Sequence, residues 1–134
     1  MEYALELSRS VRQNSGQVFL YMTWSREATP ETQDKLKESY EAVAKRTGAT
    51  VAPVGLAWKL ARERIPGVSL YATDGSHPSR IGSYLAACVI YSTLTGELCK
   101  GLRNVVMSED AYGESTSLTR ISKANAVALQ SIAD

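Results

Sequence analysis

The chain has 134 residues, 44% of them hydrophobic and 22% charged, which is the composition of one ordinary globular domain with its own core. The net charge of +1 and the interleaving of acidic with basic residues argue against binding to nucleic acid or to an anionic membrane surface. No apolar run is long enough to span a bilayer, and residues 1–10 contain Glu2 and Glu6 without an apolar signal core. We therefore expect a single domain over residues 1–134 with no transmembrane segment, and the sequence leaves its compartment open.

The cysteine and histidine content gives no sign of a metal site. Two cysteines, Cys88 and Cys99, do not make a disulfide framework, and no spacing of cysteine with the single histidine suggests zinc. Cys88 lies in an apolar helical run and is expected to be a small buried side chain. The sequence leaves open whether Cys99 is free or paired. We therefore expect no metal site.

The N-terminal part predicts a helix followed by a buried strand. Residues 3–14 have the apolar spacing of an amphipathic helix that Asn14, Ser15 and Gly16 should end. Residues 17–23 include a continuous apolar run, which suits a strand in the middle of a parallel sheet because such a strand is buried on both faces.

The next elements are a second helix and a second strand. Residues 29–31 read Thr-Pro-Glu, which predicts a helix start with a hydroxyl cap, a proline in the first turn and an acid near the positive end of the helix dipole. This helix should run to residue 47, where Gly48 supplies a left-handed stop. Residues 49–54 predict a short strand, with Pro53 at its end because proline cannot donate to a ladder.

The second half of the chain is mainly helical. Residues 53–65 predict a helix, and residues 79–95 give the strongest helical pattern, with Gly96 at its end. Residues 97–117 look irregular and polar, and residues 118–133 predict a final helix.

Strands that alternate with helices predict an α/β fold with a parallel sheet covered by helices. Only two strands are convincing, however, and two parallel strands make a poor sheet with an unpaired edge on each. We therefore expect a layered α/β fold from which some strands are missing.

The loop over residues 71–79 carries the chemistry. Asp74-Gly75 favours a turn, Pro78 restricts the backbone of His77, and Ser79 can cap the following helix. A histidine acting as a general base needs one ring nitrogen free and the other held by a partner that fixes its tautomer. A carboxylate three residues earlier could do this, although Asp and His occur at this spacing by chance in many proteins.

A longer match makes the motif more specific. The segments that carry it are Asp74-Gly75-Ser76-His77-Pro78-Ser79, Gly82-Ser83-Tyr84-Leu85-Ala86-Ala87 with Tyr91, Val51-Ala52-Pro53-Val54-Gly55 with Ala57-Trp58, and Tyr21-Met22-Thr23-Trp24. Together they resemble the C-terminal part of the SGNH (GDSL-like) hydrolase family, whose last conserved block is an Asp-x-x-His-Pro loop running into a helix. The resemblance spans residues 17–96 and is strongest at 71–91.

The resemblance implies a three-layer α/β/α sandwich around a parallel, flavodoxin-like sheet, here without its N-terminal strands. It implies that Asp74 and His77 correspond to the acid and base of a Ser-His-Asp triad. The implied activity is hydrolysis of esters in lipids, small acyl esters or acylated carbohydrates, with no cofactor. An upstream segment or a second copy of the chain would complete the sheet.

The sequence also departs from the family. It contains no Gly-Asp-Ser nucleophile block, and neither the oxyanion-hole glycine nor the Gly-x-Asn-Asp block is visible. Ser25 follows a strand but lacks a glycine-rich sharp turn, which makes it a poor replacement. Trp24 and Trp58 could both line an acyl or sugar pocket, although large aromatic residues near strand ends more often lie in the core. Trp24 is the better candidate substrate-binding residue of the two, because it lies at the same strand end as Ser25. The alternatives to an enzyme are a non-catalytic remnant, a binding module, or an interaction protein that pairs its strand edge.

Overall fold

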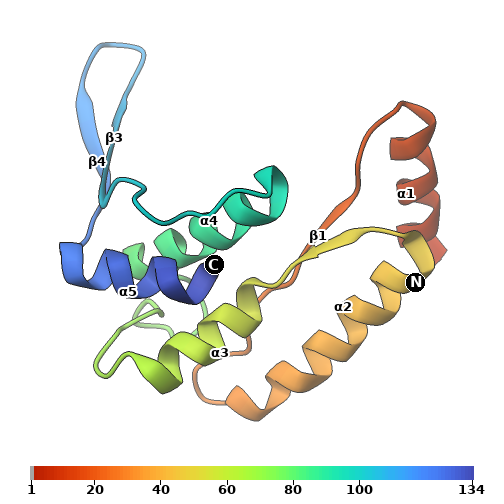
Figure 1. Cartoon of the computed structure of the whole chain (residues 1–134), viewed down its shortest axis with the longest axis horizontal. Coiled ribbons are helices and arrows are strands. Elements are labelled where there is room, and N and C mark those ends of the chain that lie inside the picture. Colours follow the sequence, from red (N-terminus) through yellow and green to blue (C-terminus); the bar gives the residue numbers. More distant parts are fainter. Residues whose placement is uncertain (1) are drawn as a thin grey trace.

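The computed structural model describes residues 2–134 and shows a mixed α/β fold (Figure 1). Met1, the first residue of the segment assessed for a secretory signal, lies outside them. The helices are α1 (Glu2–Gln13), α2 (Gln33–Thr47), α3 (Val54–Arg64), α4 (Arg80–Thr95) and α5 (Lys123–Ala133), with a 3-10 turn η1 (Pro30–Thr32) before α2. The strands are β1 (Phe19–Tyr21), β2 (Thr50–Ala52), β3 (Val105–Glu109) and β4 (Ser115–Arg120).

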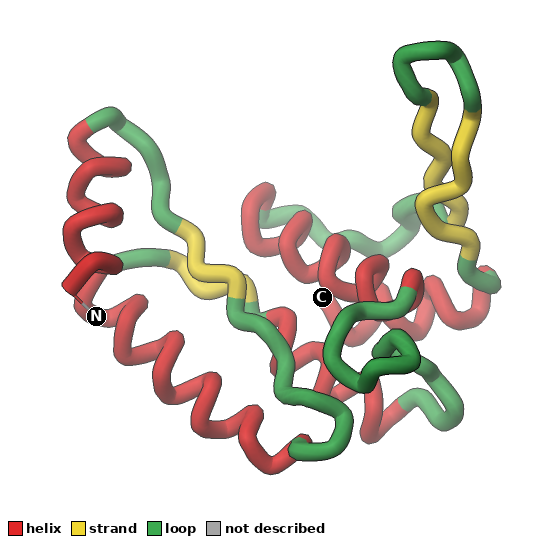
Figure 2. Tube along the Cα trace, turned by 180° about the vertical axis from the view of Figure 1, so that it is seen from behind, coloured by secondary structure: helices red, strands yellow, loops and turns green. Residues whose placement is uncertain are grey.

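The predicted parallel pair is present. β1 and β2 pair in parallel, with Leu20 opposite Val51. Both strands are shorter than the apolar runs that predicted them, and each pairs with one strand only among residues 2–134. Seen from behind in Figure 2, the strand pair lies between α1 and α2 on one side and the remaining helices on the other. β2 contacts both α2 and α4.

The start of α2 differs from the prediction in one respect. The Thr29 hydroxyl makes no capping hydrogen bond, because a 3-10 turn begins at Pro30 and carries the chain into the helix. The end of α2 is as predicted. Gly48 adopts a left-handed conformation, with φ of 64°, and donates its N–H to the carbonyl of Ala44.

The core lies among α3, α4 and α5, where Trp58, Leu85 and Leu129 are buried. Gly82 lets α4 approach this core closely. A Cβ atom at Gly82 would lie 2.2 Å from the Leu70 carbonyl oxygen and 2.6 Å from Cζ2 of Trp58. Only glycine fits there without a shift of the backbone, so the α3–α4 contact depends on the missing side chain.

The expectation for residues 97–117 was wrong. Two strands, β3 and β4, form an antiparallel hairpin there, with a register shift between Val106 and Met107. The hairpin projects from the helical body in both views (Figures 1 and 2). The predicted start of the last helix at Leu118 was also wrong, because Leu118 lies in β4. Helix α5 begins after Ser122, whose side chain accepts a hydrogen bond from the N–H of Asn125.

Helix α5 holds the segment that follows α4. The Asp134 carboxylate accepts the N–H groups of Cys99 at 2.7 Å and Lys100 at 3.2 Å. The buried Gln130 side chain accepts the N–H of Gly101 and donates to the Tyr84 hydroxyl. The backbone N–H groups of residues 99–101 therefore all have acceptors on α5 or at its end.

Both cysteines, Cys88 and Cys99, are buried free thiols, which confirms the expectation for Cys88 and answers the question left open for Cys99. Burial is the main cause that raises the pKa of each thiol. Both are therefore protonated and poorly reactive at neutral pH. Over residues 2–134, no helix has the length and apolar character needed to cross a lipid bilayer.

Candidate active site

The loop between α3 and α4 is closed at its base by its own backbone. The Ala72 N–H donates to the His77 carbonyl, and the Ser79 N–H donates to the Leu70 carbonyl, both at 2.8 Å. Ser79 also caps α4, since its side chain accepts the N–H of Gly82. The predicted Ser79 cap is therefore present, and hydrogen bonds join the two ends of the loop.

Asp74 organises the tip of this loop. Gly75 adopts a left-handed conformation, with φ of 65°, which reverses the chain after Asp74. One carboxylate oxygen of Asp74, Oδ1, then accepts the N–H groups of Ser76 and His77, each at 2.9 Å. The other oxygen, Oδ2, lies 2.5 Å from Nδ1 of His77. The carboxylate thus holds both the backbone and the ring of the histidine.

The contact with Asp74 leaves the other side of the imidazole open. The His77 side chain is 80% exposed, and its Nε2 atom makes no hydrogen bond with any of residues 2–134. The Nδ1–H of His77, followed by the N–H groups of Ser76 and His77, holds the pKa of Asp74 well below its ordinary value. An ionised carboxylate favours the proton on Nδ1, so Nε2 keeps its lone pair and can accept a proton.

The segment after β1 supports the loop from outside. The indole Nε1–H of Trp24 donates to the Ser76 carbonyl at 2.9 Å, and the N–H of Glu27 donates to the Gly75 carbonyl at 2.9 Å. Trp24 in turn stacks on Trp58, with ring centroids 3.8 Å apart and planes inclined by 6°. These hydrogen bonds therefore join two segments that are about fifty residues apart in the sequence.

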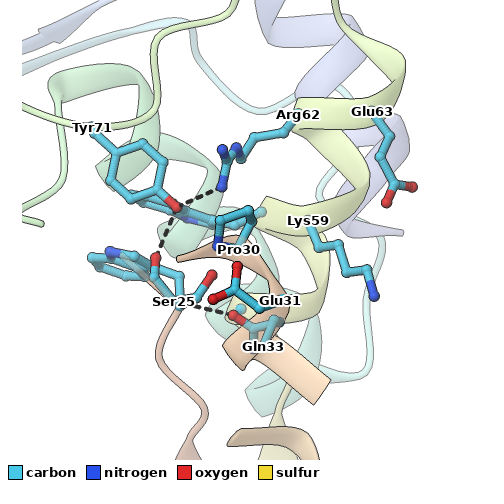
Figure 3. Close-up of a pocket in the computed structure, with 11 residues that line it drawn as sticks. Ser25, Pro30, Glu31, Gln33, Lys59, Arg62, Glu63 and Tyr71 are labelled. Carbon is cyan, nitrogen blue, oxygen red and sulfur yellow. Dashed lines mark hydrogen bonds between the residues drawn. The ribbon is translucent and has the colours of Figure 1, made fainter. Parts of the chain in front are cut away.

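A pocket of about 380 Å³ lies on the other side of Trp24. Its wall is built around Ser25, whose carbonyl accepts the Tyr71 hydroxyl at 2.8 Å and whose N–H donates to Oε1 of Gln33 at 2.7 Å. Arg62 donates to the same Tyr71 hydroxyl at 3.2 Å. Figure 3 shows Tyr71 between Ser25 and Arg62, with Gln33 against Ser25. Neither Asp74 nor His77 is among the residues that line the pocket.

The sequence-predicted residues fall into two groups. Asp74 and His77 are brought together, and Trp24 joins them to the pocket. Ser25 is only 6% exposed, so the structure offers no exposed nucleophile at that position. Trp58 is 1% exposed and lies in the core, and it is also among the residues that line the pocket.

Sequence reasoning missed three residues that build the pocket wall, namely Gln33, Arg62 and Tyr71. Arg62 is a charged residue on a helix, which usually indicates an exposed face, but it is half-buried and donates to the Tyr71 hydroxyl and the Glu27 carbonyl. Gln33 occupies the first turn of α2, where apolar periodicity carries no information about which side chain turns inward. Tyr71 is the first residue of the loop over residues 71–79, and this position was the one signal in the sequence that could have identified it.

Tyr71 acts as a donor in this wall. Burial raises the pKa of its hydroxyl, while the charge of Arg62 and the hydrogen bonds from Arg62 and to Ser25 oppose that rise. The hydroxyl therefore stays protonated at neutral pH and can donate to the Ser25 carbonyl.

Comparison with protein-family models, curated proteins and solved structures finds no match.

Proposed function

We propose that this chain supplies the base and its orienting acid in a serine ester hydrolase of SGNH type. The observation that carries the proposal is the contact between Oδ2 of Asp74 and Nδ1 of His77, with Nε2 exposed. An imidazole held in this way has a fixed tautomer and a nitrogen free to take a proton. The resemblance of residues 71–91 to the Asp-x-x-His-Pro block supports the same assignment.

In the proposed reaction, Nε2 of His77 removes the proton from a serine hydroxyl as its oxygen attacks the ester carbonyl. The histidine then gives this proton to the departing alcohol, and the acyl group stays on the serine. A water molecule then attacks the acyl-serine, with His77 again taking and returning the proton, which releases the carboxylic acid and restores the serine hydroxyl. Asp74 stabilises the imidazolium formed in each half, and no cofactor takes part.

The serine and the donors to the oxyanion come from another segment or a second polypeptide in this proposal. The sequence has no Gly-Asp-Ser, and Ser25 is buried. Without these groups, most of the rate acceleration would be absent. The chain alone is therefore expected to be a poor esterase.

The strand pair supports a larger sheet. The Met22 N–H donates to the Ala52 carbonyl and the Thr50 N–H donates to the Val18 carbonyl, so in a parallel pair the backbone groups of Phe19 and Tyr21 point to the opposite side. That edge of β1 has no partner strand among residues 2–134. Added strands there would build the three-layer α/β/α sandwich.

The pocket beside Trp24 would hold the part of the ester that does not react. Aromatic rings of Trp24 and Tyr71 give it apolar surface, and Glu31, Lys59 and Arg62 bring charges of both signs. Trp24 is thus proposed as a substrate-binding residue. Candidate substrates are lipid esters, short acyl esters and acylated carbohydrates.

A non-catalytic binding module is the second candidate. It is favoured by one observation, namely that the pocket lining includes neither Asp74 nor His77. In that case the fold would bind a ligand beside Trp24 without turnover. An interaction protein that adds a strand at the β1 edge is a variant of this candidate.

The first test is to read the gene ahead of the codon for Met1 for a predicted strand followed by Gly-Asp-Ser. If that block is found, the chain extended by it should hydrolyse a short aryl ester, and its serine should be labelled by a fluorophosphonate. Replacing His77 with Ala should lower kcat by about 10⁴-fold or more, and Asp74→Asn by about 10⁴-fold. Lys123→Ala, at an exposed position on α5, is the control.

Two outcomes would reject the proposal. One is turnover or labelling that survives His77→Ala. The other is a chain with the upstream block that folds but neither hydrolyses the ester nor reacts with the probe. Ligand binding in the pocket without labelling would then favour the binding module.

A further inference from the structure

Trp24 contacts the peptide unit that joins Ser76 to His77, the last of the three between Asp74 and His77. Its Nε1–H donates to the Ser76 carbonyl at 2.9 Å. The other half of this peptide unit is the N–H of His77, which donates to Oδ1 of Asp74 at 2.9 Å. The plane of the Ser76–His77 peptide is therefore held from opposite sides, by an indole at its oxygen and by the catalytic carboxylate at its nitrogen.

We propose that Trp24 is a positioning residue that sets the orientation of His77 through this peptide. The direction of the His77 side chain follows from the position of its Cα atom, and that atom belongs to the peptide that Trp24 fixes. If the peptide turned, the N–H of His77 would leave Oδ1 of Asp74, and the ring would leave Oδ2. The catalytic meaning of this role rests on the proposed function, but the geometric claim can be tested without any substrate.

Trp24 itself is well fixed, as an anchor must be. Its ring stacks on Trp58, which is 1% exposed on α3. Its two chain neighbours are held by one side chain, since Gln33 accepts the N–H of Ser25 and donates to the carbonyl of Thr23. The hydrogen bond to Ser76 therefore connects the loop to the core.

A second hydrogen bond joins the loop to the segment after β1. The N–H of Glu27 donates to the carbonyl of Gly75, one residue earlier in the loop. This backbone bond does not depend on a side chain, so it survives substitution of Trp24. It keeps the loop near the segment after β1 and leaves the orientation of the Ser76–His77 peptide as the feature that Trp24 controls.

The chain contains a matched control in its second tryptophan. Trp58 is the other ring of the same stack, and its Nε1–H is buried without a hydrogen-bond partner among residues 2–134. Trp24→Phe and Trp58→Phe both keep an aromatic ring in the stack. Only the first removes an N–H that bonds the loop.

The readout is the tautomer of the single histidine, measured on the whole chain by 15N NMR above the pH at which the ring loses its charge. The wild-type chain should carry the proton on Nδ1. Trp24→Phe should raise the ratio of Nε2–H to Nδ1–H by about fivefold, the effect of one neutral hydrogen bond on an equilibrium. Trp58→Phe should leave this ratio unchanged.

The proposal is overturned if Trp24→Phe leaves the ratio unchanged, or if both variants change it equally, since the cause would then be packing. Should Trp24→Phe not fold, both tryptophans can be replaced by benzothienylalanine, which has sulfur in place of the indole N–H. Because the N–H of Trp58 has no partner, a changed tautomer ratio in that protein supports the role of Trp24, and an unchanged ratio refutes it.

The catalytic consequence is tested separately. In the assembled esterase, Trp24→Phe should lower kcat about fivefold. A tautomer shift on Trp24→Phe, together with no esterase activity in the folded chain extended by the Gly-Asp-Ser block, would leave the positioning role standing and reject the proposed function. His77-dependent esterase activity with an unshifted tautomer would do the reverse.

Discussion

Replacing Gln33 with Met should destabilise the chain, because it removes a buried hydrogen-bond acceptor. The replacement is apolar but is also unbranched and of similar length, so it fills the same space. Gln33 is 2% exposed, and its Oε1 is the acceptor for the N–H of Ser25 at 2.7 Å. A buried N–H left without a partner costs about 1–3 kcal/mol. The bond from Nε2 to the Thr23 carbonyl is longer, at 3.3 Å, and is expected to contribute less. We expect the free energy of unfolding to fall by about 2 kcal/mol.

Thermal unfolding followed by circular dichroism should show this loss as a decrease in Tm of about 7 °C for a chain of this size. The matched control is Gln17→Met, at an exposed position, which should change the free energy of unfolding by no more than about 0.5 kcal/mol. If the two variants had the same Tm, the Gln33–Ser25 hydrogen bond would not hold the segment after β1, and the rigidity assigned to Trp24 would lose its support.

Three further outcomes are expected. Gly82→Ala should lower the free energy of unfolding by about 3 kcal/mol in a urea titration, because the new Cβ would meet the Leu70 carbonyl and Trp58; the gain of up to about 1 kcal/mol usual for Gly→Ala in a helix would contradict this. The pKa of Asp74 is lowered in the folded chain, so its contribution to stability is fully present above the ordinary Asp pKa and is lost as pH falls through the lowered value. Asp74→Asn should remove this part of the acid dependence of the unfolding free energy. Parallel curves of unfolding free energy against pH for the two proteins would contradict this. The unpaired edge of β1 should make the isolated chain self-associate in sedimentation velocity, whereas a monomer with one cooperative unfolding transition would speak against missing strands.

Much of the fold up to residue 96 could be predicted because local signals and burial agree there. Gly48 and Gly96 end helices in left-handed conformations, and Ser79 caps α4, as the residue types indicate. The strands were placed correctly but drawn too long. Periodicity reports which residues are apolar, whereas strand length depends on pairing, and each strand has one partner in the described chain.

The C-terminal prediction failed for a different reason. Hairpin β3–β4 exposes most of its side chains, so its residues lack the alternation of apolar and polar positions that marks a half-buried strand. Leu118 was taken as helical because it stands near the apolar residues of α5, although it is 56% exposed in β4. The cap that marks the true start, Ser122, was present in the sequence but outweighed by the apolar residues before it.

At the site, the sequence predicted the Asp74–His77 contact because both residues lie within one turn, where spacing fixes geometry. It could not predict the contact between Trp24 and Ser76 or that between Tyr71 and Ser25. These pairs are about fifty residues apart, and their meeting depends on how β1 and α3 pack. Long-range contacts of this kind follow from tertiary structure and leave no local pattern.

The carboxylate of Asp134 links the burial of Cys99 to the last turn of α5. Replacing Asp134 with Ala would leave the N–H groups of Cys99 and Lys100 without their acceptor and loosen the turn that follows α4. The thiol of Cys99, which is buried, would then open to solvent. Maleimide labelling of the Asp134→Ala variant beside the unchanged chain would thus show how far one carboxylate protects the core.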